Sequence, residues 1–173
     1  DVLSACSTDD TVAWYENDGS ENFTTHKITT TAVGANSVYA VDVDGDGDVD
    51  VLSASEGDDT IAWYENDGSE NFTEHPITTS ADRAQSVYAI DVDGDGDMDV
   101  LSASDRDDTI AWYENDGSEN FTEHPITTTA NRAWSIHTAD VDGDGDVDVL
   151  SASEEDDTIA WYENDGSENF TTH

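Results

Sequence analysis

A repeat of 49 residues dominates this sequence and limits what it can fold into. The block Trp-Tyr-Glu-Asn recurs at this spacing, beginning at Trp14, Trp63, Trp112 and Trp161. The block Asp-Val-Asp-Gly-Asp-Gly-Asp recurs at the same spacing, beginning at Asp42, Asp91 and Asp140. Residues 50–98 and 99–147 differ at only ten of 49 positions. A unit this short buries too little surface to be stable alone, so the units must share one structure and pack against one another.

Each unit shows the pattern of four short β-strands and no helical periodicity. The strands are predicted at Ser86–Val92, Val100–Ser104, Thr60–Tyr64 and Phe72–Thr78 and at the equivalent positions of the other units. Asp-Gly and Asn-Asp-Gly turn signals separate them. The only two prolines, Pro76 and Pro125, fall in the fourth strand. Because proline cannot donate to a strand ladder, this strand is predicted to lie at the outer edge of its sheet.

An all-β β-propeller made of four-stranded antiparallel blades accounts for this pattern. Residues 1–173 are expected to form one repeat domain of about three and a half blades: a partial blade at 1–30 with strands two to four, then blades at 31–79, 80–128 and 129–173. Asp1 is the equivalent of Asp50, and the sequence stops within a fourth strand. We therefore expect either a fragment of a longer propeller or a ring completed by a second copy through open blade edges.

The charge of the chain restricts its partners. Asp and Glu number 43 against 4 Lys and Arg, giving a net charge of −39. Such a surface repels phosphate backbones, so nucleic acid is excluded as a partner. No apolar run approaches the ~20 residues of a membrane-spanning helix, so membrane insertion is not expected. A hydrophobic content of 35% with five Trp still predicts a folded protein.

The Asp-rich run is predicted to be a calcium loop. It places carboxylates at loop positions one, three, five and nine and glycine at position six, where the chain must turn sharply. Ca²⁺ prefers oxygen ligands, and carboxylates this dense repel one another without a cation. We expect side chains from positions one, three, five and nine and the carbonyl of position seven to bind one Ca²⁺ per complete loop, three in the chain. The residues are Asp42, Asp44, Asp46, Asp48, Asp50; Asp91, Asp93, Asp95, Asp97, Asp99; and Asp140, Asp142, Asp144, Asp146, Asp148.

These loops are not EF-hands, because position twelve holds Ser53, Ser102 or Ser151 instead of glutamate and strands flank the loop. Asp-x-Asp-x-Asp-Gly-x-x-Asp followed by Val-Leu-Ser-Ala-Ser and Trp-Tyr-Glu-Asn-Asp-Gly resembles the FG-GAP/VCBS repeats of integrin α-chain-like β-propellers along the whole chain. The Phe-Gly and Gly-Ala-Pro signatures are absent, so the VCBS branch is the better description. The resemblance implies a seven-bladed propeller, calcium in the lower loops, and roles in adhesion, surface display or sugar binding. It implies no particular ligand.

Positions that differ between units predict a ligand face. They cluster at 31–36, 80–85 and 129–134, between the fourth strand and the next first strand, and again between strands two and three. Strand alternation places both sets at the end opposite the calcium loops. A protein or glycan ligand is expected there, with sequence drift in exposed loops as the alternative. Trp134 and His137 are peculiar to the last unit and, together with Arg132, are the candidate contacts, whereas the repeated mid-strand tryptophans are predicted to be core.

Three further patterns complete the functional prediction. Asn-Phe-Thr sequons at exposed turns predict possible N-glycosylation at Asn22, Asn71, Asn120 and Asn169. One histidine recurs per unit, without a second at ligand spacing, which argues against zinc. Carboxylate pairs are unavoidable among 43 acidic residues and no nucleophile elbow is present, so catalysis is not expected.

The sequence therefore predicts a calcium-binding β-propeller scaffold of a secreted or cell-surface protein, acting in adhesion or recognition. Three alternatives remain open: a carbohydrate-binding, lectin-like propeller, a self-assembling ring or filament protein, and a polysaccharide-active domain. Measurements of glycan binding, particle mass and turnover, respectively, would test these three alternatives.

Overall fold

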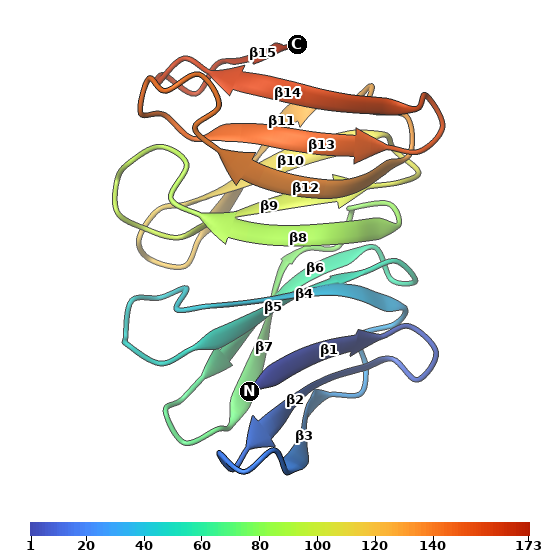
Figure 1. The fold of residues 1–173 in the computed structure, drawn as a ribbon, viewed down its shortest axis with the longest axis vertical. Coiled ribbons are helices and arrows are strands. Elements are labelled where there is room, and N and C mark those ends of the chain that lie inside the picture. The colour runs from blue at the N-terminus through green and yellow to red at the C-terminus, as the bar shows by residue number, and fades with distance from the viewer.

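The computed structural model describes residues 1–173 as four antiparallel sheets (Figure 1). The first sheet contains β1 (Val2–Cys6), β2 (Thr11–Asn17) and β3 (Phe23–Thr29). The second contains β4 (Ala35–Val41), β5 (Asp50–Ser55), β6 (Thr60–Asn66) and β7 (Phe72–Thr78). The third contains β8 (Ala84–Ile90), β9 (Asp99–Ser104), β10 (Thr109–Asn115) and β11 (Phe121–Thr127). The fourth contains β12 (Ala133–Ala139), β13 (Asp148–Ser153), β14 (Thr158–Asn164) and β15 (Phe170–Thr172). No helix long and apolar enough to cross a membrane is present.

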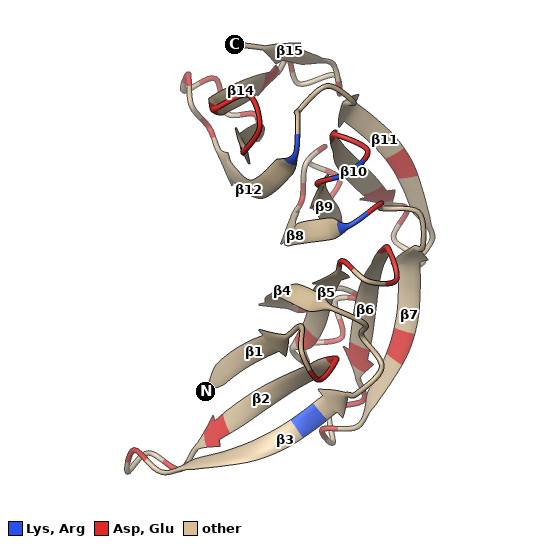
Figure 2. Ribbon diagram, turned by 90° about the vertical axis from the view of Figure 1, so that its right-hand side faces the viewer, with Lys and Arg blue, Asp and Glu red and all other residues tan.

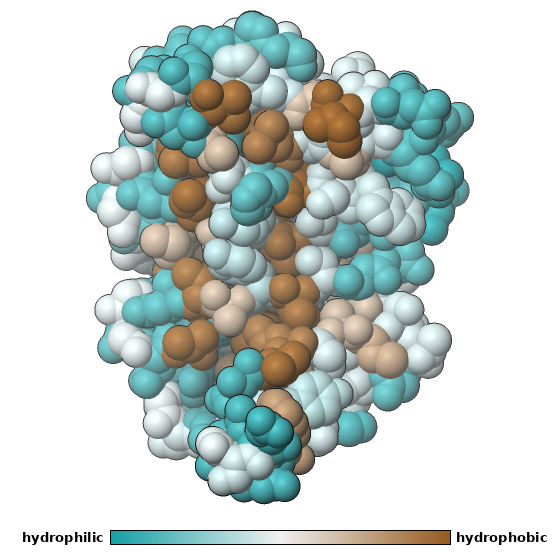
Figure 3. Space-filling model, viewed as in Figure 1, coloured by the Kyte–Doolittle hydropathy of each residue, from teal (hydrophilic) through white to brown (hydrophobic).

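The sheets stand side by side in an open arc. Strands follow chain order across every sheet, and Figure 2 shows β1, β4, β8 and β12 on the concave side with β3, β7 and β11 on the convex side. Inner strands of neighbouring sheets contact one another, and apolar residues form a band along this inner face (Figure 3). The predicted all-β repeat of four antiparallel strands is confirmed, as is the edge position of the strands that carry Pro76 and Pro125.

Strand boundaries differ from the prediction mainly in the first strand of each unit. The prediction of Ser86–Val92 was wrong at both ends, since β8 runs from Ala84 to Ile90. A register shift between Ala84 and Ser86 interrupts the alternation that marks a strand, and the two residues after Ile90 belong to the Asp-rich loop. The second strand starts one residue earlier than predicted, the third extends to Asn66, and the fourth matches Phe72–Thr78.

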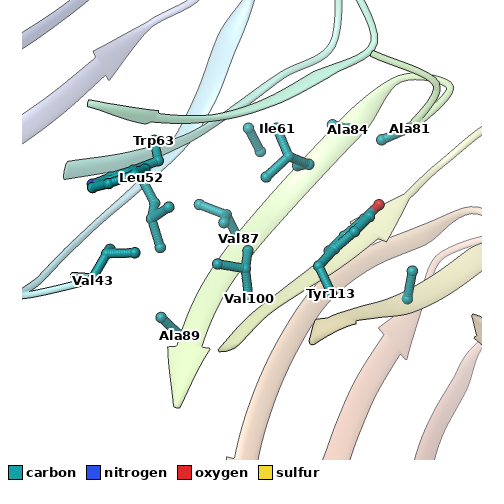
Figure 4. Packing of buried hydrophobic residues seen from close by; sticks show 12 residues of the cluster. Val43, Leu52, Ile61, Trp63, Ala81, Ala84, Val87, Ala89, Val100 and Tyr113 are labelled. Atoms are coloured by element: carbon teal, nitrogen blue, oxygen red, sulfur yellow. The ribbon is translucent and has the colours of Figure 1, made fainter. Parts of the chain in front are cut away.

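Neighbouring sheets pack face to face because successive side chains of a strand point to opposite faces. Ile61 and Trp63 of β6 point toward the third sheet and join Val87 and Tyr113 in a cluster of 12 buried residues (Figure 4). The alternate residue Ala62 points the other way and packs against the first sheet. Each complete sheet therefore has one face for the sheet before it and another for the sheet after it.

The repeated tryptophans are core where a sheet lies on both sides. Trp63 and Trp112 are 1% exposed, which confirms the prediction for these two. Trp14 and Trp161 are only partly buried, so the prediction was too strong for them. Trp14 lines a cavity of about 450 Å³ between the first two sheets. No sheet of this chain covers the corresponding face of β14, where Ile159 is 75% exposed although Ile61 and Ile110 are 0% exposed.

The recurring histidines support the tryptophans. Each histidine of a fourth strand stacks on the tryptophan of the third strand, with ring centroids 4.3–4.8 Å apart. The histidine Nε2 also lies 2.6–3.2 Å from a glutamate of the third strand. These groups are His26–Glu16, His75–Glu65, His124–Glu114 and His173–Glu163. The histidines thus hold the outer strand against the sheet.

Candidate metal centres and ligand face

The Asp-rich segments form the loops β4–β5, β8–β9 and β12–β13 at one end of the sheets (Figure 1). Their carboxylates hold the backbone in a tight curl. Asp42 accepts hydrogen bonds from the N–H groups of Gly45 (2.8 Å) and Gly47 (3.0 Å), and Asp44 accepts one from Asp46 N–H (3.1 Å). Gly47 has a φ of 99°, a conformation that side chains disfavour. The curl brings the side chains of loop positions one, three and nine toward a common point.

Three carboxylates converge in each loop. Oxygen atoms from positions one, three and nine lie within 4.8 Å of one another, in the groups Asp42, Asp44, Asp50; Asp91, Asp93, Asp99; and Asp140, Asp142, Asp148. The side chains of positions five and seven are not in these groups. Asp46 accepts a hydrogen bond from Asp48 N–H (2.8 Å), and the Asp48 carboxylate lies against Gly68 of the next turn. The ligand roles predicted for Asp46 and for the Asp48 carbonyl, and for their equivalents, stay predictions.

The position-nine carboxylate joins the loop to the sheet. Asp50, Asp99 and Asp148 are each 0% exposed. Asp50 accepts one hydrogen bond from Val43 N–H in the loop (3.0 Å) and another from Asn66 N–H at the end of β6 (2.8 Å). The other two make the same pair of bonds. Asp1 also accepts the second type of bond, from Asn17 N–H (2.8 Å).

The electrostatics of these groups favour a bound cation. Burial raises the pKa of Asp99 to about 6, although hydrogen bonds from Asn115 and Val92 oppose the rise. Burial also raises the pKa of Asp50, although the backbone hydrogen bonds from Asn66 and Val43 oppose the rise. Burial raises the pKa of Asp93, with neighbouring carboxylates contributing. A buried anionic group that offers only oxygen atoms as metal ligands fits a hard divalent cation such as Ca²⁺.

Comparison with known families identifies the repeat. The profile of the FG-GAP-like repeat matches residues 1–53, 42–102, 91–151 and 140–173, which together span the whole chain. The chain therefore belongs to the FG-GAP-like repeat family, and the predicted family is confirmed. No curated protein matches the sequence.

Two solved structures share the fold at low sequence identity. One is an Agrocybe aegerita lectin that recognises non-reducing terminal N-acetylglucosamine: TM-score 0.63, 17% identity, 95% of this chain covered and 47% of the lectin. The other is the V. cholerae biofilm matrix protein Bap1: TM-score 0.55, 19% identity, 97% of this chain covered and 27% of Bap1. The chain thus spans less than half the length of either protein, and the likeness concerns the fold.

The variable loops meet at the opposite end of the sheets. Backbone hydrogen bonds join the two sets, for example Gly57 N–H to Val33 O (2.9 Å). Arg83 and Arg132 have φ values of 59° and 55°, like Gly34 at 70° in the equivalent position. Non-glycine residues are uncommon in this left-handed region. The backbone N–H of each arginine donates a hydrogen bond to an aspartate of the preceding sheet; for Arg132 the acceptor is Asp108 Oδ1, at 2.8 Å.

A row of ion pairs connects three sheets at this end. The oppositely charged atoms lie 3.4 Å apart for Glu56–Arg83, 3.3 Å for Arg83–Asp105, 3.3 Å for Asp105–Arg132 and 3.0 Å for Arg132–Glu154. Asp105 is shared by both arginines and its side chain is 3% exposed. The variable loops were predicted from the sequence, but the ion pairs between them were not. The sequence does carry a signal for this pairing, because arginine appears where the preceding unit has an acidic residue, whereas Gly34 follows a unit with Ser7.

The predicted ligand contacts occupy two places on β12. Trp134 is 49% exposed and lies two residues from Arg132 at the start of the strand. His137 is three residues further along, or about 10 Å at strand spacing. Its ring and that of Tyr88 form a T-shaped pair with centroids 5.3 Å apart. The structure therefore separates His137 from Trp134. The sequon asparagines lie at exposed turns, where their side-chain amides donate to Asp18, Asp67, Asp116 and Asp165.

Proposed function

We propose that this chain is a calcium-stabilised blade array of a β-propeller that acts as a recognition scaffold outside the cell, in adhesion or glycan binding, and not as an enzyme. The observation that carries the proposal is the threefold recurrence of one buried and two more exposed carboxylates at the same loop end. The fold shared with a lectin and a biofilm matrix protein supports recognition as the role.

Calcium would act here by stabilising the loops and the sheets that they join. The carboxylates of each triad would bind it, together with the position-five side chain and the position-seven carbonyl. Burial raises the pKa of Asp44 and Asp93, and repulsion between the carboxylates adds to the rise; a cation in the triad would remove that repulsion. Because Asp50 is bonded to both the loop and β6, a cation there would also hold two strands of the sheet together.

The test is a calcium titration of the 173-residue chain, monitored by thermal unfolding and isothermal calorimetry. Three sites per chain and a rise in Tm are expected, with dissociation constants of about 10⁻⁴ to 10⁻³ M, typical of extracellular modules. Asp99→Asn should reduce the stoichiometry to two. Asp107→Asn, in a loop at the opposite end, is the matched control and should keep three sites. Absence of a calcium-dependent change in Tm would contradict the calcium assignment.

A second candidate function is self-assembly, favoured by the exposed face of β14. Ile159 is 75% exposed there, although the same residue is 0% exposed at both internal junctions that contain it. In a second copy, the outer face of the first sheet would pack on β14 in the way that the face of β6 with Ala62 and Tyr64 packs on the first sheet. Sedimentation of the calcium-loaded chain distinguishes the two roles: a mass that is a multiple of 18.7 kDa supports assembly, and a monomer contradicts it.

The sequons supply an independent test of extracellular processing. Secretion of the chain from a eukaryotic host should add glycans at the exposed asparagines Asn22, Asn71, Asn120 and Asn169. Intact mass before and after glycosidase treatment measures their number. An unmodified secreted chain would contradict this part of the proposal.

A further inference from the structure

The inner strands carry a repeated irregularity that aims one side chain per sheet. Register shifts occur between Ala35 and Ser37 in β4, Ala84 and Ser86 in β8, and Ala133 and Ser135 in β12. The extra residues at these shifts are Asn36, Gln85 and Trp134. Bulges of this kind redirect a side chain away from the ladder. The three residues therefore occupy equivalent places beside the row of ion pairs.

Between the second and third sheets, this place is closed by polar contacts. Asn36 Nδ2 donates to Gln85 Oε1 (3.0 Å), and Gln85 Nε2 donates to Glu56 Oε2 (3.1 Å) and Arg83 O (3.2 Å). Gln85 is 6% exposed as a result. The internal network occupies the groups that a ligand would use.

Between the third and fourth sheets, the equivalent place has no such amide network, and an indole is exposed there. Trp134 stands where Gln85 stands in the preceding unit, and no aromatic ring is stacked on its exposed indole. Asp105 replaces Glu56, and Arg132 Nε donates to its Oδ1 (3.3 Å). Its Oδ2 accepts no hydrogen bond, although the carboxylate is 3% exposed and Arg83 lies 3.3 Å away. A buried acceptor without a hydrogen bond is costly and is uncommon in folded proteins.

We propose that this junction is a single glycan-binding subsite in which a pyranose ring stacks on Trp134 and its hydroxyl groups bond to Asp105 and Arg132. The proposal rests on the recognition role proposed above. A pyranose combines an apolar C–H face, which fits an indole, with hydroxyls that can both donate to a carboxylate and accept from a guanidinium. The net charge of −39 disfavours an anionic ligand. Only this junction has the indole, so one site per chain is expected.

The first experiment applies the calcium-loaded chain to an array of glycans that differ in their non-reducing terminal sugar. The methyl glycoside of the sugar that binds is then titrated by calorimetry. A shallow surface site for one sugar should give a dissociation constant of about 1 mM and a stoichiometry of one. Trp134→Gln, which introduces the residue of the preceding unit, should weaken binding at least about tenfold. Trp134→Phe should retain part of the affinity.

The control is Phe23→Ser, which removes a 52% exposed aromatic ring from β3 and should leave glycan affinity unchanged. Because Trp134 is half exposed, its variants should also keep the calcium-dependent Tm, which shows that they fold. Glycan binding that survives Trp134→Gln would overturn this subsite but leave the recognition role standing. A chain that binds a protein ligand and no glycan would do the same. A chain that binds neither would overturn both proposals.

Discussion

The repeat provides a matched test of how the sheets pack, because one isoleucine occurs in two environments. Ile110 of β10 is 0% exposed at the junction with the fourth sheet, and Ile159 of β14 is 75% exposed. Both lie at the same place in nearly identical strands. We expect Ile110→Ala to destabilise the chain strongly and Ile159→Ala to have little effect.

The magnitudes follow from the burial. Replacing isoleucine with alanine removes three carbons, worth about 0.8 kcal/mol each when fully buried, so the transfer loss at Ile110 is about 2.4 kcal/mol. The cavity left behind brings the total to about 3–4 kcal/mol. Ile159 has only a quarter of its surface buried, so the same replacement should cost about 0.6 kcal/mol or less.

Urea unfolding in saturating calcium, followed by both circular dichroism and tryptophan fluorescence, measures the two losses. Coincident transitions are required, since repeat arrays can unfold in steps. A loss below about 1 kcal/mol for Ile110→Ala would refute the packing of β10 against the fourth sheet. Equal losses for both variants would show that the β14 face is covered in solution. Sedimentation at the same concentration would then show whether a second copy covers it.

Two further predictions concern charge. The raised pKa of Asp99 means that its carboxyl group stays protonated to a higher pH in the native state than in the unfolded chain. Without calcium, ionisation of Asp99 should therefore lower the free energy of unfolding as the pH rises from about 4 to about 6. Calcium needs the ionised form, so its stabilising effect should be larger at pH 7 than at pH 5, and Asp99→Asn should remove that part of the pH dependence; a pH-independent calcium effect would contradict this. Asp105→Ala should cost about 1–2 kcal/mol, because it leaves two half-exposed arginines without their shared acceptor, whereas Glu154→Ala, at a 55% exposed side chain, should cost about 0.5 kcal/mol or less. Urea midpoints with and without 1 M NaCl measure both, and equal losses would refute the distinction.

Much of the fold could be predicted from the sequence because local and global signals agree. Turn residues, period-two alternation and the two prolines all define the same four-stranded unit, and the repeat length requires side-by-side packing. The misplaced ends of β8 show the limit of that reasoning. A bulge at Ala84 and Ser86 preserves the strand while breaking the alternation by which a strand is recognised.

The candidate sites were predictable to different degrees. The metal loops are local, since all three converging carboxylates of a loop lie within nine residues, and spacing alone brings them together. The ion-pair row is not local. Arg83 and Asp105 are 22 residues apart and meet only because their loops lie at the same end of the sheets. A partner on another strand cannot be identified from the spacing of residues within one loop.

Nearly identical units also raise a question of order, because the packing faces of β6 and β10 carry the same residues and do not distinguish one neighbour from another. The ion-pair row differs from junction to junction. Asp105 needs an arginine on each side, and a sheet placed out of order would lose these pairs or bring like charges together, which favours one arrangement over its alternatives. We therefore interpret the variable end as serving two purposes. The same residues surround the proposed glycan subsite, where Trp134 is exposed and Asp105 Oδ2 accepts no hydrogen bond. The order of the sheets and the position of that subsite therefore depend on the same few side chains.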